Sequence, residues 1–268
     1  MSDASAMHIW YQSMTVLEEM GPYEESLRRR ASQLMRRTDT VEVRGIEAAA
    51  YHGHTPGEVF RYPYLKAIVQ RRSMVAAIEA ERSRFDAYII GSFSEPFLKE
   101  TRSAVEIPVI SMAESCMSTA LSLADRFALI SLSSRYAHRL AALVRRHGLE
   151  SRFGGAYGLT GDMTEREMVA AFASPRRTLD QFLAVASEAA GNGVDLIIPA
   201  EGMISQLLFD NGVRTIAGAD IMDSVGVCLL HARMLVEMKR ALDLGHCRHS
   251  SYPVPPRPLR EEFSRDMS

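Results

Sequence analysis

Two polar residues, Ser92 and Glu201, follow apolar runs of similar sequence. In each run an aspartate, Asp86 or Asp195, opens an apolar stretch, and the polar residue comes six positions later. At the carboxyl ends of parallel strands, such residues would line the edge where open α/β sheets bind ligands. A carboxylate can act as a general base, and a serine hydroxyl can donate a hydrogen bond to developing negative charge. The alternative is a chance similarity between two buried strands.

The rest of the chain alternates short apolar runs with longer amphipathic stretches, the pattern of parallel sheets with crossover helices. We expect strands over residues 7–11, 40–45, 87–91, 109–112, 127–132, 196–200 and 213–216. We expect helices over residues 63–84, 135–147, 164–190 and 223–244. The short runs 106–110 and 212–216 extend the repeat. Two similar α/β halves that face each other across a cleft are the simplest interpretation.

Two helices carry more detailed expectations. The buried face of the helix over 63–84 is expected to consist of Leu65, Ile68, Val69, Val75 and Ile78. Gly245 is a C-cap signal for the helix over 223–244. The proline-rich tail beyond it is expected on the surface or against a neighbouring subunit.

Composition limits the classes of function. The chain has 268 residues, 47% of them hydrophobic and 24% charged, with a net charge of -2. This is an ordinary globular composition, and it lacks the basic field that a nucleic-acid partner requires. No apolar run approaches the roughly 20 residues of a membrane span, and the N-terminus has no signal-peptide pattern, so a cytoplasmic protein is expected. Three widely spaced cysteines indicate neither a disulfide framework nor a standard zinc site.

Four segments resemble the aspartate/glutamate/hydantoin racemase superfamily, most closely its hydantoin racemase branch. They are QSMT at 12–15, DAYIIGSFSEP at 86–96, RFALISLSSR at 126–135 and VDLIIPAEGM at 194–203. The resemblance implies an α/β fold of two pseudo-symmetric domains, each a parallel sheet flanked by helices, with the active-site cleft between them. It also implies a discontinuous first domain of residues 1–112 plus 221–268, and a second domain of residues 113–220.

In that family two cysteines, one from each half, exchange protons with opposite faces of the substrate carbon. Ser92 stands at the first cysteine position. Glu201 stands at the second when counted from Asp195, whereas an alignment anchored on Gly202 and Met203 places Ala200 there. A serine hydroxyl is far too weak an acid to replace a thiol in this exchange near neutral pH. Two-base racemisation is therefore not expected.

The resemblance and this departure together favour a hydrolase of cyclic ureides. Glu201 would activate water against a hydantoin-like or 2-thiohydantoin-like ring with an acidic side chain, by carbonyl hydrolysis or by desulfuration with sulfide release. Ser92 and the amides of Phe93 and Ser94 would hold the oxyanion. Three alternatives stay open: a racemase or isomerase with Glu201 as base, attack by Ser92 as nucleophile, and a non-catalytic ligand-binding protein.

The remaining candidates are substrate-binding residues, and no cofactor or metal is expected. Arg61, Tyr62 and Arg135 are candidates to hold a substrate carboxylate, although the two arginines also fit a solvated surface. The other members of this set are Gln12, Ser13, Phe93, Ser94, Ser131, Ser133, Gly202 and Met203. Asp223 is expected to cap a helix. The small clusters His52/His54 and His246/Cys247/His249 are not expected to form designed metal sites. Because family members are often oligomers, a homo-oligomer is expected.

Overall fold

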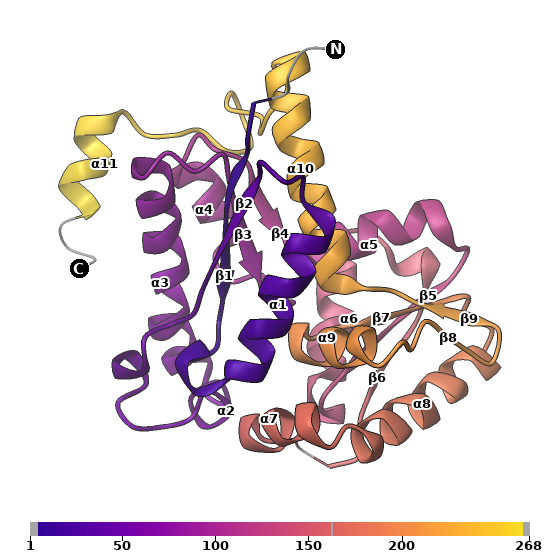
Figure 1. Cartoon of the computed structure of the whole chain (residues 1–268). Helices are drawn as coiled ribbons and strands as arrows, with labels where there is room; N and C mark the ends of the chain where they lie inside the picture. Colours follow the sequence, from indigo (N-terminus) through magenta and orange to yellow (C-terminus); the bar gives the residue numbers. More distant parts are fainter. Residues whose placement is uncertain (1–4, 162, 265–268) are drawn as a thin grey trace.

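A computed structural model describes residues 5–161 and 163–264, and within them the chain forms two sheets flanked by helices (Figure 1). The first sheet and its helices are β1 (His8–Ser13), α1 (Gly21–Leu34), β2 (Thr40–Arg44), α2 (Pro56–Val59), α3 (Pro63–Arg82), β3 (Ala87–Gly91), α4 (Leu98–Ala104), β4 (Val109–Ser111) and α5 (Met112–Leu123). The second group is β5 (Phe127–Ser131), α6 (Ala137–Arg146), β6 (Phe153–Gly158), α7 (Glu165–Ala173), α8 (Arg176–Gly191), β7 (Leu196–Pro199), α9 (Gly202–Asp210), β8 (Thr215–Ile216) and β9 (Ala219–Ile221). The chain ends with α10 (Ser224–Leu242) and α11 (Arg257–Ser264).

The two sheets have the same strand order, which confirms the predicted α/β fold class. The first sheet runs β2-β1-β3-β4 with all strands parallel. The second runs β6-β5-β7-β9-β8, and its first four strands are parallel. β1 and β3 are therefore interior strands of the first sheet, and β5 and β7 are interior strands of the second. β3 and β7, the strands of the sequence repeat, are topological equivalents. The domain boundaries stay a prediction.

Two strands of the second sheet were not predicted. β6 has the sequence FGGAYG, whose glycines lack the side chains that make a strand recognisable. The run 212–216 was expected to match β4, but the strand that it contains, β8, is antiparallel to β9. A tight turn at Ala217 and Gly218, with φ angles of 49° and 87°, joins the two. The equivalent of β4 is therefore β9, which lies parallel to β7.

Two helix predictions were wrong in their boundaries. The stretch 164–190 is interrupted between α7 and α8, where Ser174 precedes Pro175. Proline disfavours the helical conformation of the residue before it, and Ser174 has a φ of -137° and a ψ of 73°. The last long helix ends at Leu242, and Asp243 rather than Gly245 takes the left-handed conformation at its end, with a φ of 51°.

The buried face of α3 also differs from the prediction. Leu65 and Ile68 are 39% and 42% exposed. Val69 and Ile78 are buried as predicted, and small or polar residues complete the inner face. Ser73 of this face accepts a 2.6 Å hydrogen bond through its backbone oxygen from the Tyr88 hydroxyl. Small side chains bring α3 close to β3, so the apolar residues expected to mark its inner face partly lie outside.

Helices α1 and α10 join the halves. The main core cluster contains residues of both sheets together with α1, α5, α9 and α10. Helix α10 packs on α5, α1 and β3, although it follows the second sheet in the chain. The tail beyond it lies over the first half of its own chain, where Arg248 donates to the backbone oxygen of Val105 at 2.9 Å. Residues 265–268 of the tail lie outside the described residues.

Within the described ranges, every helix is too short or too polar to span a bilayer.

Candidate active site

Ser92 follows the last residue of β3. In the sheet register Gly91 lies opposite Ser13 of β1, so both predicted residues stand at the same edge. Gly91 is required there, because a Cβ atom would lie 2.6 Å from the ring of Tyr11 and 2.8 Å from the backbone oxygen of Gln12. The close approach of β1 to β3 thus fixes the position of Gly91, the last residue of β3. The half-buried Ser92 begins the turn that follows.

Hydrogen bonds order the turn after β3. The Ser94 amide donates to Ser92 Oγ at 3.3 Å, and the two serine hydroxyls lie 3.0 Å apart. Gln70 of α3 donates to the Ser94 hydroxyl at 3.2 Å. The Ser94 amide was expected to hold an oxyanion, but here it binds Ser92. Phe93 is buried, as expected for an apolar wall.

Glu201 occupies the equivalent place after β7. The Ala200 amide donates to the backbone oxygen of Ile130 at 2.7 Å, which continues the pairing of β7 with β5. Ala200 is 1% exposed, whereas Glu201 is half-buried at the N-cap position of α9. The Glu201 side chain makes no cap hydrogen bond. Of the two residues that compete for this position, Glu201 keeps solvent access and carries the ionisable group.

Tyr23 of α1 reaches across to Glu201, and the sequence did not reveal it. Its hydroxyl lies so close to Gly202 that a Cβ atom there would be 2.4 Å away. Burial raises the pKa of Tyr23; the hydroxyls of Tyr11 and Ser13 oppose this shift, and the negative charge of Glu201 adds to it. Tyr23 therefore stays protonated at neutral pH. A residue of the first half, held by α1, thus stands beside the carboxylate of the second half.

Tyr11, from β1, is the neighbour of Tyr23. Its hydroxyl is buried and lies next to that of Tyr23. Burial and the neighbouring Tyr23 raise its pKa. Two buried, protonated tyrosines thus lie next to each other, and Tyr23 interacts with both Ser13 and Glu201.

Lys66 of α3 and Arg139 of α6 are two further residues that sequence reasoning missed. Burial lowers the pKa of Lys66, the positive charge of Arg139 lowers it further, and the negative charge of Glu201 opposes the shift. Lys66 also lies over the ring of Phe60, 5.7 Å from its centre. Lys66 is thus within electrostatic range of Arg139, which comes from the other half, and of the candidate base Glu201.

The predicted carboxylate-binding residues lie on the outside. Tyr62 is 61% exposed, and Arg61 and Arg135 are also exposed. Lys66 is four residues beyond Tyr62 and donates its amide to the Tyr62 backbone oxygen at 2.9 Å, so one turn of helix separates the predicted region from the half-buried cation.

The other predicted binding residues are largely engaged with the protein itself. Gln12 accepts from Trp10 at 3.0 Å and donates to the backbone oxygens of Ser13 and Gly45 at 3.0 Å, which leaves it a positioning role. Ser131 donates to the backbone oxygen of Ser133 at 2.7 Å. Ser133 Oγ accepts from the Arg135 amide at 3.2 Å. Met203 is 8% exposed and Gly202 is buried.

The cysteines lie apart from proton-transfer chemistry. Burial raises the pKa values of the Cys116 and Cys228 thiols, so both stay protonated in the core. Cys247 lies exposed in the tail. Among residues 5–161 and 163–264, no three His, Cys, Asp or Glu side chains form a group that could hold a metal ion.

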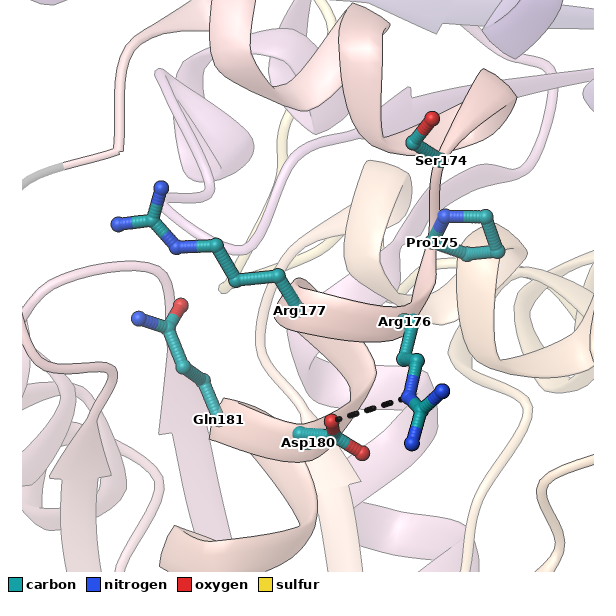
Figure 2. A pocket seen from close by; sticks show the side chains of 6 residues that line it. All are labelled: Ser174, Pro175, Arg176, Arg177, Asp180 and Gln181. Carbon is teal, nitrogen blue, oxygen red and sulfur yellow. Dashed lines mark ion pairs between the residues drawn. The ribbon is translucent and has the colours of Figure 1, made fainter.

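A separate surface hollow of about 690 Å³ lies where α7 meets α8. Figure 2 shows its lining residues Ser174, Pro175, Arg176, Arg177, Asp180 and Gln181. Arg176 and Asp180 form an exposed ion pair at 3.9 Å across it. None of these residues belongs to the candidate site.

Ser92 and Glu201 thus follow two equivalent strands, one in each sheet, and comparisons with known proteins agree with this architecture. The Asp/Glu/hydantoin racemase family model matches residues 29–222. No curated protein matches the sequence. Allantoin racemase from Klebsiella pneumoniae is 18% identical, with a TM-score of 0.72 over 95% of both chains.

Two further solved structures extend the likeness. Allantoin racemase from Pseudomonas fluorescens is 17% identical, with a TM-score of 0.70 over 94% of this chain and 98% of that one. Glutamate racemase RacE1 from Bacillus anthracis is 10% identical, with a TM-score of 0.59 over 97% and 93% of the two chains. Identities this low show a shared fold alone. The family model, which spans most of the chain, shows more: the chain belongs to the Asp/Glu/hydantoin racemase family.

Proposed function

We propose that this protein catalyses proton transfer at a carbon atom next to a carbonyl group, as a racemase or isomerase of a hydantoin-like or amino-acid-like substrate. The supporting observation is the place of Glu201, a half-buried carboxylate at the carboxyl end of β7 beside Tyr23 and within electrostatic range of Lys66. Family membership supports the reaction class. The similar fold of two allantoin racemases supports a hydantoin-like ring, because allantoin is itself a hydantoin.

In this proposal Glu201 removes the proton from the substrate carbon. The negative charge that develops on the neighbouring carbonyl oxygen is stabilised by hydroxyl donors and by a nearby cation. Ser92 and Ser94 supply hydroxyls at the opposite strand end, and Lys66 supplies the cation. Tyr23 stays protonated and holds its hydroxyl beside Glu201.

A single base has a stereochemical consequence. Glu201 can return a proton to the face from which it took one, and a serine hydroxyl is a poor acid for delivery to the other face. We therefore propose that proton exchange with solvent outpaces inversion. In the two-cysteine members of the family, both faces have a thiol.

We place a substrate anion against Lys66 and Arg139. These residues come from α3 and α6, so an anionic group bound between them would contact both halves. A substrate with an acidic side chain fits this arrangement of charges.

A hydrolase or desulfhydrase is the second candidate, and Ser92 is the observation that favours it. A serine in place of a thiol removes one acid of the racemase pair but keeps a hydrogen-bond donor for an oxyanion. Glu201 would then activate water against a ring carbonyl or thiocarbonyl. This candidate is weakened because the Ser94 amide, which was expected to hold the oxyanion, already donates to Ser92 Oγ.

The deciding experiment uses deuterium oxide and a panel of 5-substituted hydantoins and 2-thiohydantoins, with and without a carboxylated side chain. Proton magnetic resonance follows loss of the C5 proton and of the ring, chiral chromatography follows inversion, and a thiol-sensitive dye follows sulfide. We expect C5 exchange that Glu201→Gln slows by about 10²–10⁴-fold, the usual contribution of a general base.

Glu100→Gln, an exposed glutamate of α4, is the matched control and should exchange like the parent. Ring loss or sulfide release that depends on Glu201 would replace the proposal with the hydrolytic candidate. Binding without any turnover across the panel would contradict both.

A further inference from the structure

Glu95 is a buried carboxylate in the turn after β3, and the proton-transfer proposal does not use it. Its side chain is 1% exposed. The turn holds it in an unusual backbone conformation with a φ of 48°, and its amide donates to the Ser92 backbone oxygen at 3.3 Å. The conformation of Glu95 is therefore linked directly to that of Ser92.

The carboxylate of Glu95 has partners on two other elements. Oε1 accepts from the Ser111 hydroxyl, at the end of β4, and from the Glu114 amide at 3.0 Å, in the first turn of α5. Oε2 accepts from Arg146 at 3.1 Å and from His147 Nε2 at 2.8 Å, both at the end of α6. One buried side chain thus connects the turn of Ser92 with β4, α5 and the helix that follows β5.

The ionised form of Glu95 can accept hydrogen bonds from all four of these donors. Burial alone would raise its pKa, but the hydrogen bonds of His147 and Ser111 and the positive charges of His147 and Arg146 more than offset this, so the pKa is lowered. On α5 the Glu114 carboxylate is paired with Arg102, and on α6 the neighbouring Arg145 is exposed. Because an ionised carboxylate can only accept hydrogen bonds, the bond to His147 requires that Nε2 of His147 carries a hydrogen.

We propose that Glu95 is the positioning residue of the Ser92 turn. It fixes Ser92 and Ser94 in the first half relative to α6, and so relative to the second half that carries Glu201. Its role in catalysis rests on the proposed function, because it acts by placing the Ser92 hydroxyl. Its role in ordering the turn does not depend on any substrate.

Hydrogen exchange of the Ser94 and Glu95 amides tests the inference without turnover. Both amides are bonded to Ser92, so their exchange reports the turn itself. Two variants break the contacts from opposite sides: Glu95→Gln removes the charge, and His147→Asn removes one donor while leaving the turn sequence intact. We expect exchange of these amides to quicken by about tenfold or more in both, with the amides of α3 unchanged.

Arg145→Met is the matched control for the helix end, because Arg145 is the exposed neighbour of Arg146. It should exchange like the parent. If Glu95→Gln fails to fold, His147→Asn still decides. Parent-like exchange at Ser94 and Glu95 in His147→Asn would overturn the inference, whether or not the enzyme turns over.

A pH series separates positioning from general stability. Because the pKa of folded Glu95 is lowered, its contribution to protection is complete above the ordinary glutamate value of about 4.3 and is lost as the pH falls through the lowered pKa. Glu95→Gln should lack this step. Once a substrate is known, His147→Asn should lower kcat by about tenfold with little change in KM. Equal losses in Arg145→Met would contradict the positioning role.

Discussion

The contact between Tyr23 and Gly202 makes the candidate base depend on one hydroxyl group of another helix. Gly202→Ala would place a methyl group 2.4 Å from the Tyr23 hydroxyl, so we expect it to lower the free energy of unfolding by about 1–3 kcal/mol and to reduce turnover. Tyr23→Phe removes the hydroxyl, and the next atom of the ring lies at 3.5 Å. Gly202→Ala should therefore cost much less in the Tyr23→Phe background, which urea unfolding of the four proteins measures.

Gly191→Ala, with nothing within 4 Å of its added methyl group, is the control for this cycle. Additive effects of Gly202→Ala and Tyr23→Phe would contradict the proposed contact.

Lys66 is expected to set the preference for anionic substrates. Lys66→Met should raise KM for a carboxylated substrate by about tenfold, because it removes a cation that binds the anion, and it should also lower kcat, because the same cation stabilises the charge that develops during proton transfer. Because the pKa of Lys66 is lowered, raising the pH should remove its charge before the ordinary lysine pKa of about 10.4 is reached. The affinity for the anion should fall with that charge.

Steady-state kinetics against pH check this expectation, with Lys99→Met on exposed α4 as the control. An unchanged KM in Lys66→Met would remove Lys66 from the site.

At this scale the sequence alone selects Ser92 and Glu201 as candidates, because both follow strands of an internal repeat. It could not identify Tyr23, Lys66 or Arg139. These residues reach the site from helices whose rotation depends on packing, and no local pattern distinguishes them from other helical tyrosines, lysines and arginines. Arg61 and Tyr62 were selected for their side-chain chemistry, but they lie one turn before the half-buried Lys66.

Among the elements, strands with continuous apolar runs were predicted well, whereas β6 and β9 were missed. The glycines of β6 carry no hydrophobic signal, and β9 is a short strand beyond a turn that was not foreseen. The interruption at Pro175 could have been predicted from the proline alone. The buried face of α3 was predicted only in part: Val69 and Ile78 are buried, but close packing on β3 places small and polar side chains at the other inner positions.

Asp223 shows how the start of α10 is joined to α1, and the predicted cap is confirmed. Its Oδ1 accepts from the Gly226 amide at 2.8 Å, and its Oδ2 accepts from Arg30 of α1 at 2.6 Å. Asp223→Ala should lower the free energy of unfolding by about 2–3 kcal/mol, since it removes a cap worth about 1 kcal/mol and leaves a largely buried arginine without its ion pair.

Asp223→Asn keeps a cap acceptor and should lose less, as measured by urea unfolding. Asp180→Ala, which breaks only the exposed pair with Arg176, should change stability by less than about 0.5 kcal/mol. Equal losses in the alanine and asparagine variants would contradict the role of the cap.

At the scale of the whole molecule, the common strand order of the two sheets gives the sequence repeat a structural basis. Helix α1 then fixes the halves against each other through side chains: Arg29 contacts Asp210 at 2.6 Å, and Ser26 donates to Gln206 at 3.0 Å. The family resemblance already implied two facing halves. The contacts that hold them together required the structure, because they join residues about 180 positions apart.

The predicted homo-oligomer is a property of the same scale. Leu230 and Met234 of α10 are 41% and 44% exposed and lie one helical turn apart. Sedimentation velocity over a hundredfold range of protein concentration should show a species heavier than the 29.8 kDa monomer. A single monomer-sized species throughout would contradict the prediction.

The path of the chain has a consequence for its synthesis on the ribosome. The first sheet is translated early, yet α10, which packs on α1 and β3, comes only after the whole second sheet. Until residue 242 has left the exit tunnel, the apolar surface that α10 covers stays open on the nascent chain. The strands of the second sheet come from one continuous segment, so this sheet can fold before α10, which completes the first half, has been synthesised.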